Sequence, residues 1–346
     1  MAELSPKEAM YWQPQEGGRV HCLLCPHGCR IAEGDFGLCR VRQNVGQTLR
    51  TLNYERVSAV HWDPIEKKPL FHFYPGSTIL SLGTFGCNLA CAFCQNWSIS
   101  QEAPGTRRLT SEEASRIAGS DPKNIGIAYT YNEPFIWYEY VLETARLIRQ
   151  GGLHNVLVTN GYVQEQPLRE ILPFIDAMNV DIKSMREEFY RDLCRGRSDP
   201  PRRTVEIAHA AGCHVEVTNL IIPNWNDSDR EIHWLVDWLA GVDPGIPLHF
   251  SRYHPDHKFT EPPTPIQTLL SAREIAAKKL HYVYIGNVRV GDGENTVCPN
   301  CGQTVIARDG FQVSHIAVRD GKCEFCGEGI AIVGSPKSPR PEEAAR

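Results

Sequence analysis

The chain has 346 residues, of which 42% are hydrophobic and 22% charged, as in a globular protein that buries a core. The formal net charge of −5 argues against a nucleic-acid partner held mainly by phosphate contacts. No apolar run approaches the roughly 20 residues that span a bilayer, and the first residues lack the pattern of a secretory signal. We therefore expect a cytoplasmic protein with no membrane partner.

Composition along the chain predicts five segments. Residues 1–18 are polar and contain Pro and Gly, which predicts a flexible lead-in, and residues 19–50 are expected to form an N-terminal Cys-rich metal module. A catalytic domain is expected over 51–290, a zinc-ribbon-like module over 291–334 and a disordered tail over 335–346.

The 13 cysteines fall into three groups, with Cys194 and Cys213 left alone. Disulfides are rare in the cytosol, where clustered thiols usually bind metal or do redox work. The grouping therefore predicts three metal sites. Cys194, near the expected barrel mouth, is either a hydrogen-atom donor or acceptor or a small buried residue, and Cys213 is expected in the core.

The first group has the spacing C-x2-C-x3-C-x9-C and consists of Cys22, Cys25, Cys29 and Cys39. Two roles fit it: a structural zinc site, or an auxiliary iron–sulfur cluster that relays electrons or touches substrate. His27 is a candidate to replace one thiolate. The C-x2-C pair at its start favours structural zinc.

A regular alternation of elements begins at residue 78. Buried strands are predicted at 78–83, 124–130, 154–160, 176–183, 214–222, 246–251 and 281–286. Amphipathic helices are predicted between them, one of them starting at a capping box formed by Thr110 and Glu113. Such alternation predicts βα units, a parallel sheet and a partial (β/α)6-type barrel of the α/β class.

Polar residues cluster where these strands end. In parallel α/β barrels the reacting groups gather at the carboxyl ends of the strands. The candidates are Asn132, Glu133, Asn160, Asp181, Lys183, Asn219 and His254.

The second cysteine group follows the first barrel strand, in the stretch GCNLACAFCQNW (86–97). Cys87, Cys91 and Cys94 are spaced C-x3-C-x2-C. A cubane cluster normally takes four thiolates, so three leave one iron open to a small chelating molecule. Gly86 permits a tight turn, and Phe93 could cover an aromatic ligand. The weaker alternatives are a zinc site completed by His72 and three inert core thiols.

This motif resembles the radical S-adenosylmethionine (SAM) superfamily. The resemblance implies a [4Fe-4S] cluster on Cys87, Cys91 and Cys94, with SAM chelating the fourth iron. It also implies an electron donor such as flavodoxin or ferredoxin. An electron from the cluster would cleave a carbon–sulfur bond of SAM to give methionine and a 5′-deoxyadenosyl radical, which abstracts hydrogen from a substrate that the sequence does not identify.

Further motifs resemble the glycyl-radical-enzyme (pyruvate formate-lyase) activating enzymes. They are YTYNEPF (129–135), VTNG (158–161) and DIK (181–183), although Val158 stands where that family has an acidic residue. The resemblance implies that Glu133, Asp181 and Lys183 contact the methionine part of SAM, and that His254 lies near its ribose. A zwitterion needs both an anion and a cation, which Glu133 and Lys183 would supply.

Longer strings, among them GTFGCNLACAFCQNWSIS and NTVCPNCG, are similar to the radical SAM enzyme of the AmmeMemoRadiSam system. That resemblance implies AMMECR1-like and Memo-like partner proteins.

The third group consists of two C-x2-C-G knuckles with Cys298, Cys301, Cys323 and Cys326. This pattern is typical of a zinc ribbon, and four thiolates leave zinc no open position, which indicates a structural site. Rubredoxin-like iron is the alternative. No dense basic run lies between the knuckles, so we do not expect them to bind nucleic acid.

The main prediction is a radical SAM enzyme. One rival is an activase whose substrate is the backbone glycine of a partner protein. A second is a non-catalytic iron–sulfur or zinc scaffold. A third, an RNA-modifying radical enzyme, is disfavoured by the net negative charge.

Overall fold

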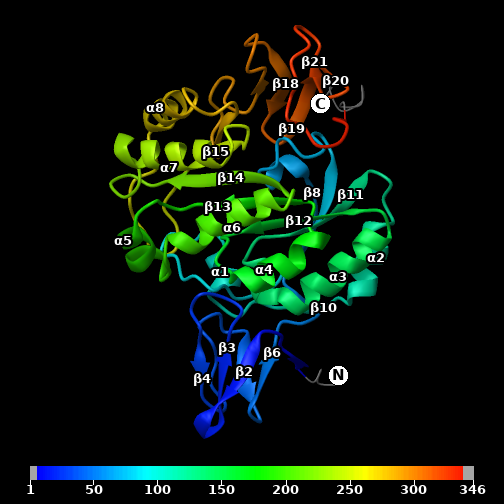
Figure 1. Ribbon diagram of the computed structural model, residues 1–346, viewed down its shortest axis with the longest axis vertical. Coiled ribbons are helices and arrows are strands. Elements are labelled where there is room, and N and C mark those ends of the chain that lie inside the picture. The colour runs from blue at the N-terminus through cyan, green and yellow to red at the C-terminus, as the bar shows by residue number, and fades with distance from the viewer. Residues whose placement is uncertain (1–5, 338–346) are drawn as a thin grey trace.

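The structure, a computed structural model, describes residues 6–337. Residues 338–346 of the expected tail and 1–5 of the expected lead-in lie outside this range. The chain is arranged in three parts along its long axis (Figure 1). The N-terminal strands occupy one end, a large sheet with its helices lies in the middle, and the C-terminal strands occupy the other end.

The central sheet has eight strands in the order β16-β15-β14-β13-β12-β11-β9-β8. Neighbours from β9 to β16 are parallel, and β8 pairs antiparallel with β9. The strands are β8 Ala59–Pro64, β9 Thr78–Gly83, β11 Asn124–Tyr129, β12 His154–Thr159, β13 Ala177–Asp181, β14 His214–Ile221, β15 Leu248–Arg252 and β16 Val283–Gly286. The predicted α/β fold with a parallel sheet is confirmed, and the antiparallel edge strand was not predicted.

Helices connect the parallel strands and cover the sheet (Figure 1). They are α1 Trp97–Ser100, α2 Ser111–Ala118, α3 Tyr138–Gln150, α4 Glu165–Ile171, α5 Glu187–Phe189, α6 Asp199–Ala210, α7 Asp229–Val242 and α8 Ile266–Ala276. Short helical turns are η1 Glu16–Gly18, η2 Ile65–Lys67, η3 Pro134–Trp137, η4 Leu172–Phe174 and the π-helical η5 Tyr190–Cys194. The predicted capping box begins α2, because Thr110 and Glu113 exchange side-chain and backbone hydrogen bonds.

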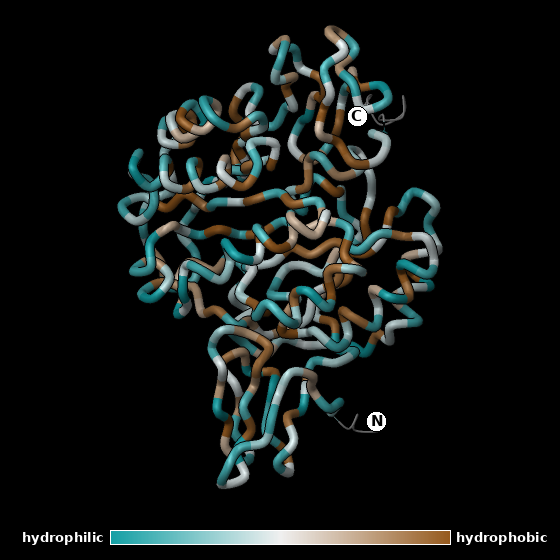
Figure 2. The backbone as a smooth tube through the Cα atoms, in the orientation of Figure 1, coloured by the Kyte–Doolittle hydropathy of each residue, from teal (hydrophilic) through white to brown (hydrophobic). Residues whose placement is uncertain are grey.

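The core lies between the sheet and its helices, where the strands are hydrophobic along most of their length (Figure 2). Ile127, Leu157, Val180 and Val217, from four successive strands, are fully buried. Parallel strands buried on both faces are expected to read as continuous apolar runs, which is why the sequence pattern located them well. Among residues 6–337, no helix is long and apolar enough to cross a bilayer.

Two small sheets form the N-terminal end. One contains β2 Trp12–Gln15, β3 Arg19–Cys22 and β4 Arg30–Ile31, and the other β1 Lys7–Glu8, β6 Thr48–Thr51 and β5 Arg42–Val45. The expectation of a flexible lead-in is therefore wrong for residues 7–8 and 12–15, which pair with β6 and β3. The pairing of β1 with β6 joins residues more than 40 positions apart, whereas β2 and β3 form a local hairpin in a polar segment.

The C-terminal end holds β17 Thr296–Val297, β18 Thr304–Asp309 and β19 Gln312–Ile316 in one sheet, and β20 Val318–Arg319 with β21 Lys322–Cys323 in another. A further short pair, β7 Arg56–Val57 with β10 Arg107–Arg108, lies beside the central sheet.

Candidate active site

The central cysteine loop leaves the carboxyl end of β9 and ends at α1. Two of its sulfur atoms have polar partners. Cys87 Sγ accepts hydrogen bonds from Leu89 N at 3.4 Å and from Asn160 Nδ2 at 3.6 Å. Cys94 Sγ shares a hydrogen bond of 3.2 Å with Ser100 Oγ. Donors near sulfur stabilise the thiolate form, which is the form that binds metal.

Cys91 is buried and contacts Cys194, which the sequence had left as an isolated residue. The hydrogen bond from Cys194 lowers the pKa of the Cys91 thiol, and Lys183 acts in the same direction against the effect of burial. Burial and the nearby Glu133 instead raise the pKa of Cys87. The loop therefore combines one thiol that ionises readily with one that needs a cation to do so.

The three sulfur atoms of the loop are not arranged for zinc. A tetrahedral zinc with Zn–S bonds of about 2.3 Å places its sulfur atoms about 3.8 Å apart. Within residues 6–337, the C-terminal quartet is the one set of three or more His, Cys, Asp or Glu ligand atoms that all lie within 4.8 Å of one another. In a cubane each thiolate binds a different iron, so a wider spacing is expected.

His72 does not complete the cysteine loop. Its Nδ1–H donates to the carbonyl of Ala331 at 2.8 Å, and its Nε2 accepts from the Tyr284 hydroxyl at 2.6 Å. His72 thus links β16 of the central sheet to the C-terminal segment. The alternative of a zinc site completed by His72 is wrong.

Asn132 braces the start of the loop. Its Oδ1 accepts from Thr84 N at 3.1 Å, and its Nδ2 donates to the carbonyl of Gly86 at 2.8 Å. Gly86 has φ +86°, and a Cβ there would stand 2.6 Å from the carbonyl oxygen of Cys39. The loop therefore packs directly on the N-terminal segment, and a glycine is required at this contact.

Glu133 is 2% exposed and connects the ends of β11 and β12. Its carboxylate accepts from Phe135 N at 2.9 Å, Thr159 Oγ1 at 2.8 Å and Asn160 N at 2.8 Å. Burial raises its pKa to about 7, although these hydrogen bonds oppose the shift. Three internal donors favour a positioning role, and contact with the SAM ammonium remains a prediction.

Asn160 and Asn88 form an amide pair beside Cys87. Asn160 Nδ2 donates to Asn88 Oδ1 at 2.9 Å, and Asn88 Nδ2 donates to the carbonyl of Tyr162 at 2.7 Å. The sequence analysis missed Asn88, although it lies inside the cysteine motif. The pair fixes the loop against the end of β12.

Lys183 supplies the positive charge of the site. Its ammonium lies 3.4 Å from Asp181 Oδ2 and 5.9 Å from the centre of the Phe93 ring. Burial opposes its charge, but Asp181 and the thiol of Cys91 raise its pKa well above the usual value. Lys183 therefore stays protonated next to the cysteine loop.

Phe93 packs among aromatic side chains. It is 2% exposed and packs against Phe189 at 5.7 Å and Phe259 at 6.1 Å between ring centres. The ring thus packs in the protein interior, and its role in covering a ligand remains a prediction.

Asn219 has a buried acceptor to spare. Its Nδ2 donates to the carbonyl of Ile182 at 2.7 Å, whereas its Oδ1 has no hydrogen-bond partner among the described residues. An unpaired buried acceptor costs about 1–3 kcal/mol, so a donor from a bound molecule is expected there.

His254 lies beside the cysteine loop but is exposed. Its Nε2 is 3.1 Å from Gln95 Nε2. The same segment is tied to the loop because Lys258 N donates to the carbonyl of Ala92, and Trp97 Nε1 donates to Asp256 Oδ1.

These residues fit an iron–sulfur cluster with SAM. Three thiols with donors nearby suit a cluster that keeps one iron free, and the charged Lys183 suits a carboxylate. The unpaired Asn219 Oδ1 suits an ammonium or hydroxyl donor.

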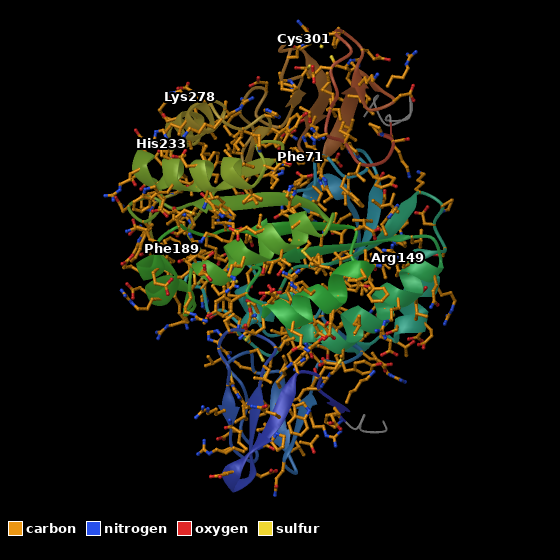
Figure 3. The ribbon with its side chains drawn as sticks, viewed as in Figure 1. Phe71, Arg149, Phe189, His233, Lys278 and Cys301 are labelled. Atoms are coloured by element: carbon orange, nitrogen blue, oxygen red, sulfur yellow. The ribbon has the colours of Figure 1, made fainter. Side chains whose placement is uncertain are left out.

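The C-terminal quartet fits zinc. Cys298 Sγ is 3.6 Å from Cys326 Sγ, and Cys301 Sγ is 3.8 Å from Cys323 Sγ, as a tetrahedral sulfur site requires. Figure 3 shows Cys301 at the tip of the C-terminal strands, far from Phe189, which packs on Phe93. The quartet could therefore bind a metal, apart from the central cysteine loop.

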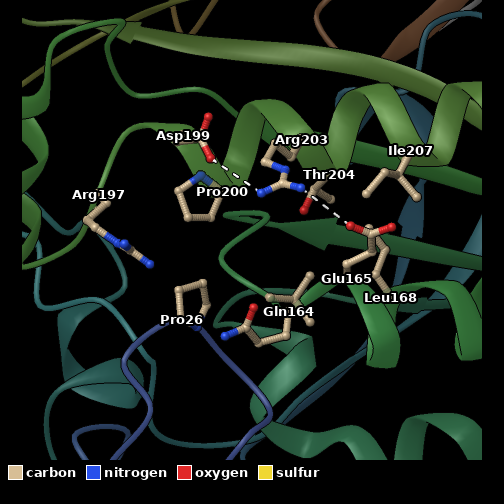
Figure 4. Close-up of a pocket in the computed structure, with 11 residues that line it drawn as sticks. Pro26, Gln164, Glu165, Leu168, Arg197, Asp199, Pro200, Arg203, Thr204 and Ile207 are labelled. Carbon is tan, nitrogen blue, oxygen red and sulfur yellow. Dashed lines mark hydrogen bonds and ion pairs between the residues drawn. The ribbon is translucent and has the colours of Figure 1, made fainter.

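Two cavities flank the sheet. One of about 210 Å³ lies between Pro26 and helices α4 and α6, where Arg203 pairs with Glu165 and Asp199 (Figure 4). Its walls contain none of the cysteines. The other cavity, of about 670 Å³, is lined by Thr218 of β14, which pairs with Asp181 on the adjacent strand β13, and by C-terminal residues such as Phe311. The second cavity therefore reaches the strand ends.

The cysteine motif of residues 86–97 lies in a segment that matches a known protein family. The model of the radical SAM superfamily matches residues 82–234, which include the cysteine loop and all the strand-end candidates except His254. An uncharacterized protein of Methanocaldococcus jannaschii is 44% identical over 337 residues, covering 94% of this chain and 99% of that protein.

Similarity to characterised proteins is more distant. Pyruvate formate-lyase 1-activating enzyme of Escherichia coli is 25% identical over 179 residues, which is 49% of this chain and 71% of that enzyme. The structure of Streptococcus suis SuiB bound to S-adenosylmethionine shares the fold, with a TM-score of 0.50, 14% identity and coverage of 61% of this chain and 52% of that chain.

Proposed function

Because the radical SAM superfamily model matches residues 82–234, which contain the cysteine loop, we propose that the chain reductively cleaves SAM at a [4Fe-4S] cluster held by Cys87, Cys91 and Cys94. When bound, the cluster and SAM supply a one-electron cleavage that releases methionine and a 5′-deoxyadenosyl radical able to abstract hydrogen from a substrate. The observation that carries this proposal is the wide, donor-supported thiol trio at the carboxyl end of β9.

The residues of the chain hold and orient the reactants. Lys183 would pair with the carboxylate of SAM, and Asn219 Oδ1 would accept from one of its N–H or O–H donors. Glu133 and Asn160 keep the loop in place, and Asp181 keeps Lys183 charged. The cavity that reaches Thr218 offers room for a substrate.

The test is anaerobic reconstitution of the full chain with iron and sulfide, reduction with dithionite in the presence of SAM, and measurement of 5′-deoxyadenosine. We expect formation in the wild type and loss of at least 100-fold in Cys91→Ala. Cys213→Ala is the matched control, because Cys213 is also buried but its Sγ contacts only the carbonyl of His214 among the described polar groups. A yield that Cys91→Ala leaves unchanged would contradict the proposal.

A second candidate is activation of a glycyl radical enzyme, which the similarity to pyruvate formate-lyase activating enzymes favours. The substrate would then be a backbone glycine of a partner protein. Incubation with pyruvate formate-lyase, SAM and reduced flavodoxin should give the EPR signal of an organic radical on that partner. Formation of 5′-deoxyadenosine without this signal would leave the first proposal standing and exclude this substrate.

The remaining assignments are also proposals. Reduced flavodoxin or ferredoxin would supply the electron, and zinc would occupy the C-terminal quartet, whose thiol spacing supports it. The motif resemblance supports AMMECR1-like and Memo-like proteins as partners, and co-purification of the three proteins tests this.

A further inference from the structure

Three of the four N-terminal cysteines, Cys22, Cys25 and Cys29, lie at one turn between β3 and β4, and Cys39 lies in a later turn. Cys22 ends β3, and its backbone N–H donates to the carbonyl of Cys29 at 2.9 Å. Cys25 lies in the turn between them, where Gly28 N donates to its carbonyl at 3.1 Å. Cys22, Cys25 and Cys39 are buried, Cys29 is half-buried, and none forms a disulfide.

Three of the four thiols are almost fully shielded from water. Cys22, Cys25 and Cys39 are 6%, 9% and 9% exposed. Cysteines that bind a metal are commonly enclosed by the protein in this way.

Their spacing differs from that of the C-terminal quartet. The C-terminal sulfur atoms have the separations of 3.6 and 3.8 Å that one tetrahedral metal requires. Within residues 6–337, no three N-terminal sulfur atoms all lie within 4.8 Å of one another. The same is true of Cys87, Cys91 and Cys94. The N-terminal thiols thus share the wider arrangement of the central loop, as expected where each thiolate binds its own iron.

Arg42 provides an independent observation. It is 1% exposed; Nη2 pairs with Glu139 Oε1 at 2.5 Å, and Nη1 donates to the carbonyl of Met10 at 2.7 Å. Its Nε is buried without an acceptor among the described residues, and its carbonyl closes the turn that contains Cys39, because Gly37 N donates to it at 2.8 Å. A buried N–H without a partner costs about 1–3 kcal/mol. The sulfur atoms of a cluster accept such hydrogen bonds.

The alternative ligand His27 has another role. Its Nε2–H donates to the carbonyl of Asn88 at 2.7 Å, and its ring packs on Tyr162 at 4.9 Å. His27 therefore cannot replace a thiolate through Nε2. It links the N-terminal turn to the central cysteine loop.

We propose that Cys22, Cys25, Cys29 and Cys39 hold a second iron–sulfur cluster of the cubane type, a one-electron carrier, in place of the structural zinc favoured by the C-x2-C pair. The site adjoins the central loop, because Cys25 shares a buried apolar cluster with Leu89 and Cys91. This proposal does not rest on the cleavage of SAM, because iron at this site is measured without it.

The test is metal analysis of the full chain after anaerobic reconstitution with iron and sulfide. We expect about eight irons, about eight sulfides and about one zinc per wild-type chain. About four irons per chain, all of them lost when Cys87, Cys91 and Cys94 are replaced and none lost when Cys25 and Cys39 are replaced, would overturn the proposal.

Variants assign the iron to its site. Replacing Cys87, Cys91 and Cys94 by Ala should leave about four irons and, after reduction, a cluster EPR signal that SAM does not perturb. Replacing Cys25 and Cys39 by Ala should also leave about four irons, but with a signal that SAM does perturb. A Cys301→Ala, Cys326→Ala chain is the matched control and should lose zinc alone. If the first variant fails to fold, the iron lost by the second variant still decides.

Discussion

The central cysteine loop and the C-terminal quartet differ in what holds their sulfur atoms. The C-terminal quartet is held by its own two turns, and its sulfur atoms already lie at the separations of a tetrahedral zinc site. The central loop instead depends on neighbours: Asn160 from the end of β12, Asn132 after β11, and Cys194 from η5. A metal site held by two local turns can be predicted from the spacing of its cysteines. A site held by residues from several strands can be described only once the fold is known.

The largest expected effect comes from removing one metal ligand in each of the two regions. Cys91→Ala should abolish iron binding by the central loop and lower 5′-deoxyadenosine formation by more than about 100-fold, because a lost ligand costs more than a disturbed supporting group. Its zinc content should be unchanged. Cys301→Ala should lose zinc and keep the central iron. Metal analysis that shows both metals lost in both variants would break the comparison.

A pair of asparagines provides a second test of the difference between the central loop and the C-terminal quartet. Asn160 Nδ2 and Asn300 Nδ2 each lie 3.6 Å from a cysteine sulfur, Cys87 and Cys326 respectively. Asn160→Ala should lower SAM cleavage about 10- to 100-fold, because it also removes the buried contact with Asn88. Asn300→Ala should leave zinc binding within about twofold, because Cys326 is exposed and its turn is held by the backbone. Equal effects would contradict the distinction.

Two glycines provide a matched test of packing. Gly86 has φ +86° and would place a Cβ 2.6 Å from the carbonyl oxygen of Cys39, whereas Gly302 has φ +72° with nothing within 4 Å. Gly302→Ala should therefore cost only the left-handed conformation, about 1–2 kcal/mol. Gly86→Ala should cost that and a backbone clash, about 2–4 kcal/mol in total. Urea unfolding measures both, and a smaller loss for Gly86→Ala would be the contrary result.

A dependence of stability on pH is expected at the junction of the barrel with the C-terminal segment. Burial lowers the pKa of His72 to about 3, so the folded chain keeps it neutral while the unfolded chain protonates it below about pH 6.5. Stability should therefore fall as the pH falls from about 6.5 to about 3, by up to about 1.4 kcal/mol per pH unit.

The control for this dependence is a second histidine. His72→Gln should flatten the slope of unfolding free energy against pH, whereas the exposed His233, labelled in Figure 3, should leave it unchanged when replaced by Gln. Parallel slopes for the wild type and His72→Gln would show that His72 is not the titrating group.

Much of the fold follows from local pattern. The seven parallel strands were predicted because buried strands are continuous apolar runs, and the Thr110–Glu113 box begins a helix as expected. The antiparallel β8 and the strand at 7–8 were not predicted, because their partners lie further along the chain, and the hairpin of 12–15 with 19–22 was not recognised in a polar segment that contains Pro and Gly. Pairing of that kind is decided by tertiary contacts rather than by propensity.

The candidate site, like the fold, was predicted only in part. Lys183, which was predicted from its position after a strand, lies near Phe93 of the cysteine loop, and Asn219 bonds to the backbone of Ile182 next to it. Phe93 turns into the interior, and His72 lies in another part of the molecule, because side-chain direction depends on packing partners that a motif does not contain. Asn88 was missed because its hydrogen-bond partners, Asn160 and Tyr162, lie more than 70 positions away in the sequence.

The contact between Gly86 and Cys39 has a practical consequence for anyone who trims this chain to a minimal catalytic core. A truncated protein beginning at residue 51 would lose the wall that the backbone of Cys39 and the side chain of Val41 form against the cysteine loop. It would also strip Arg42 from the buried Glu139, which typically costs about 3–5 kcal/mol. The first fifty residues are thus part of the catalytic body, and shortened versions should be cut elsewhere.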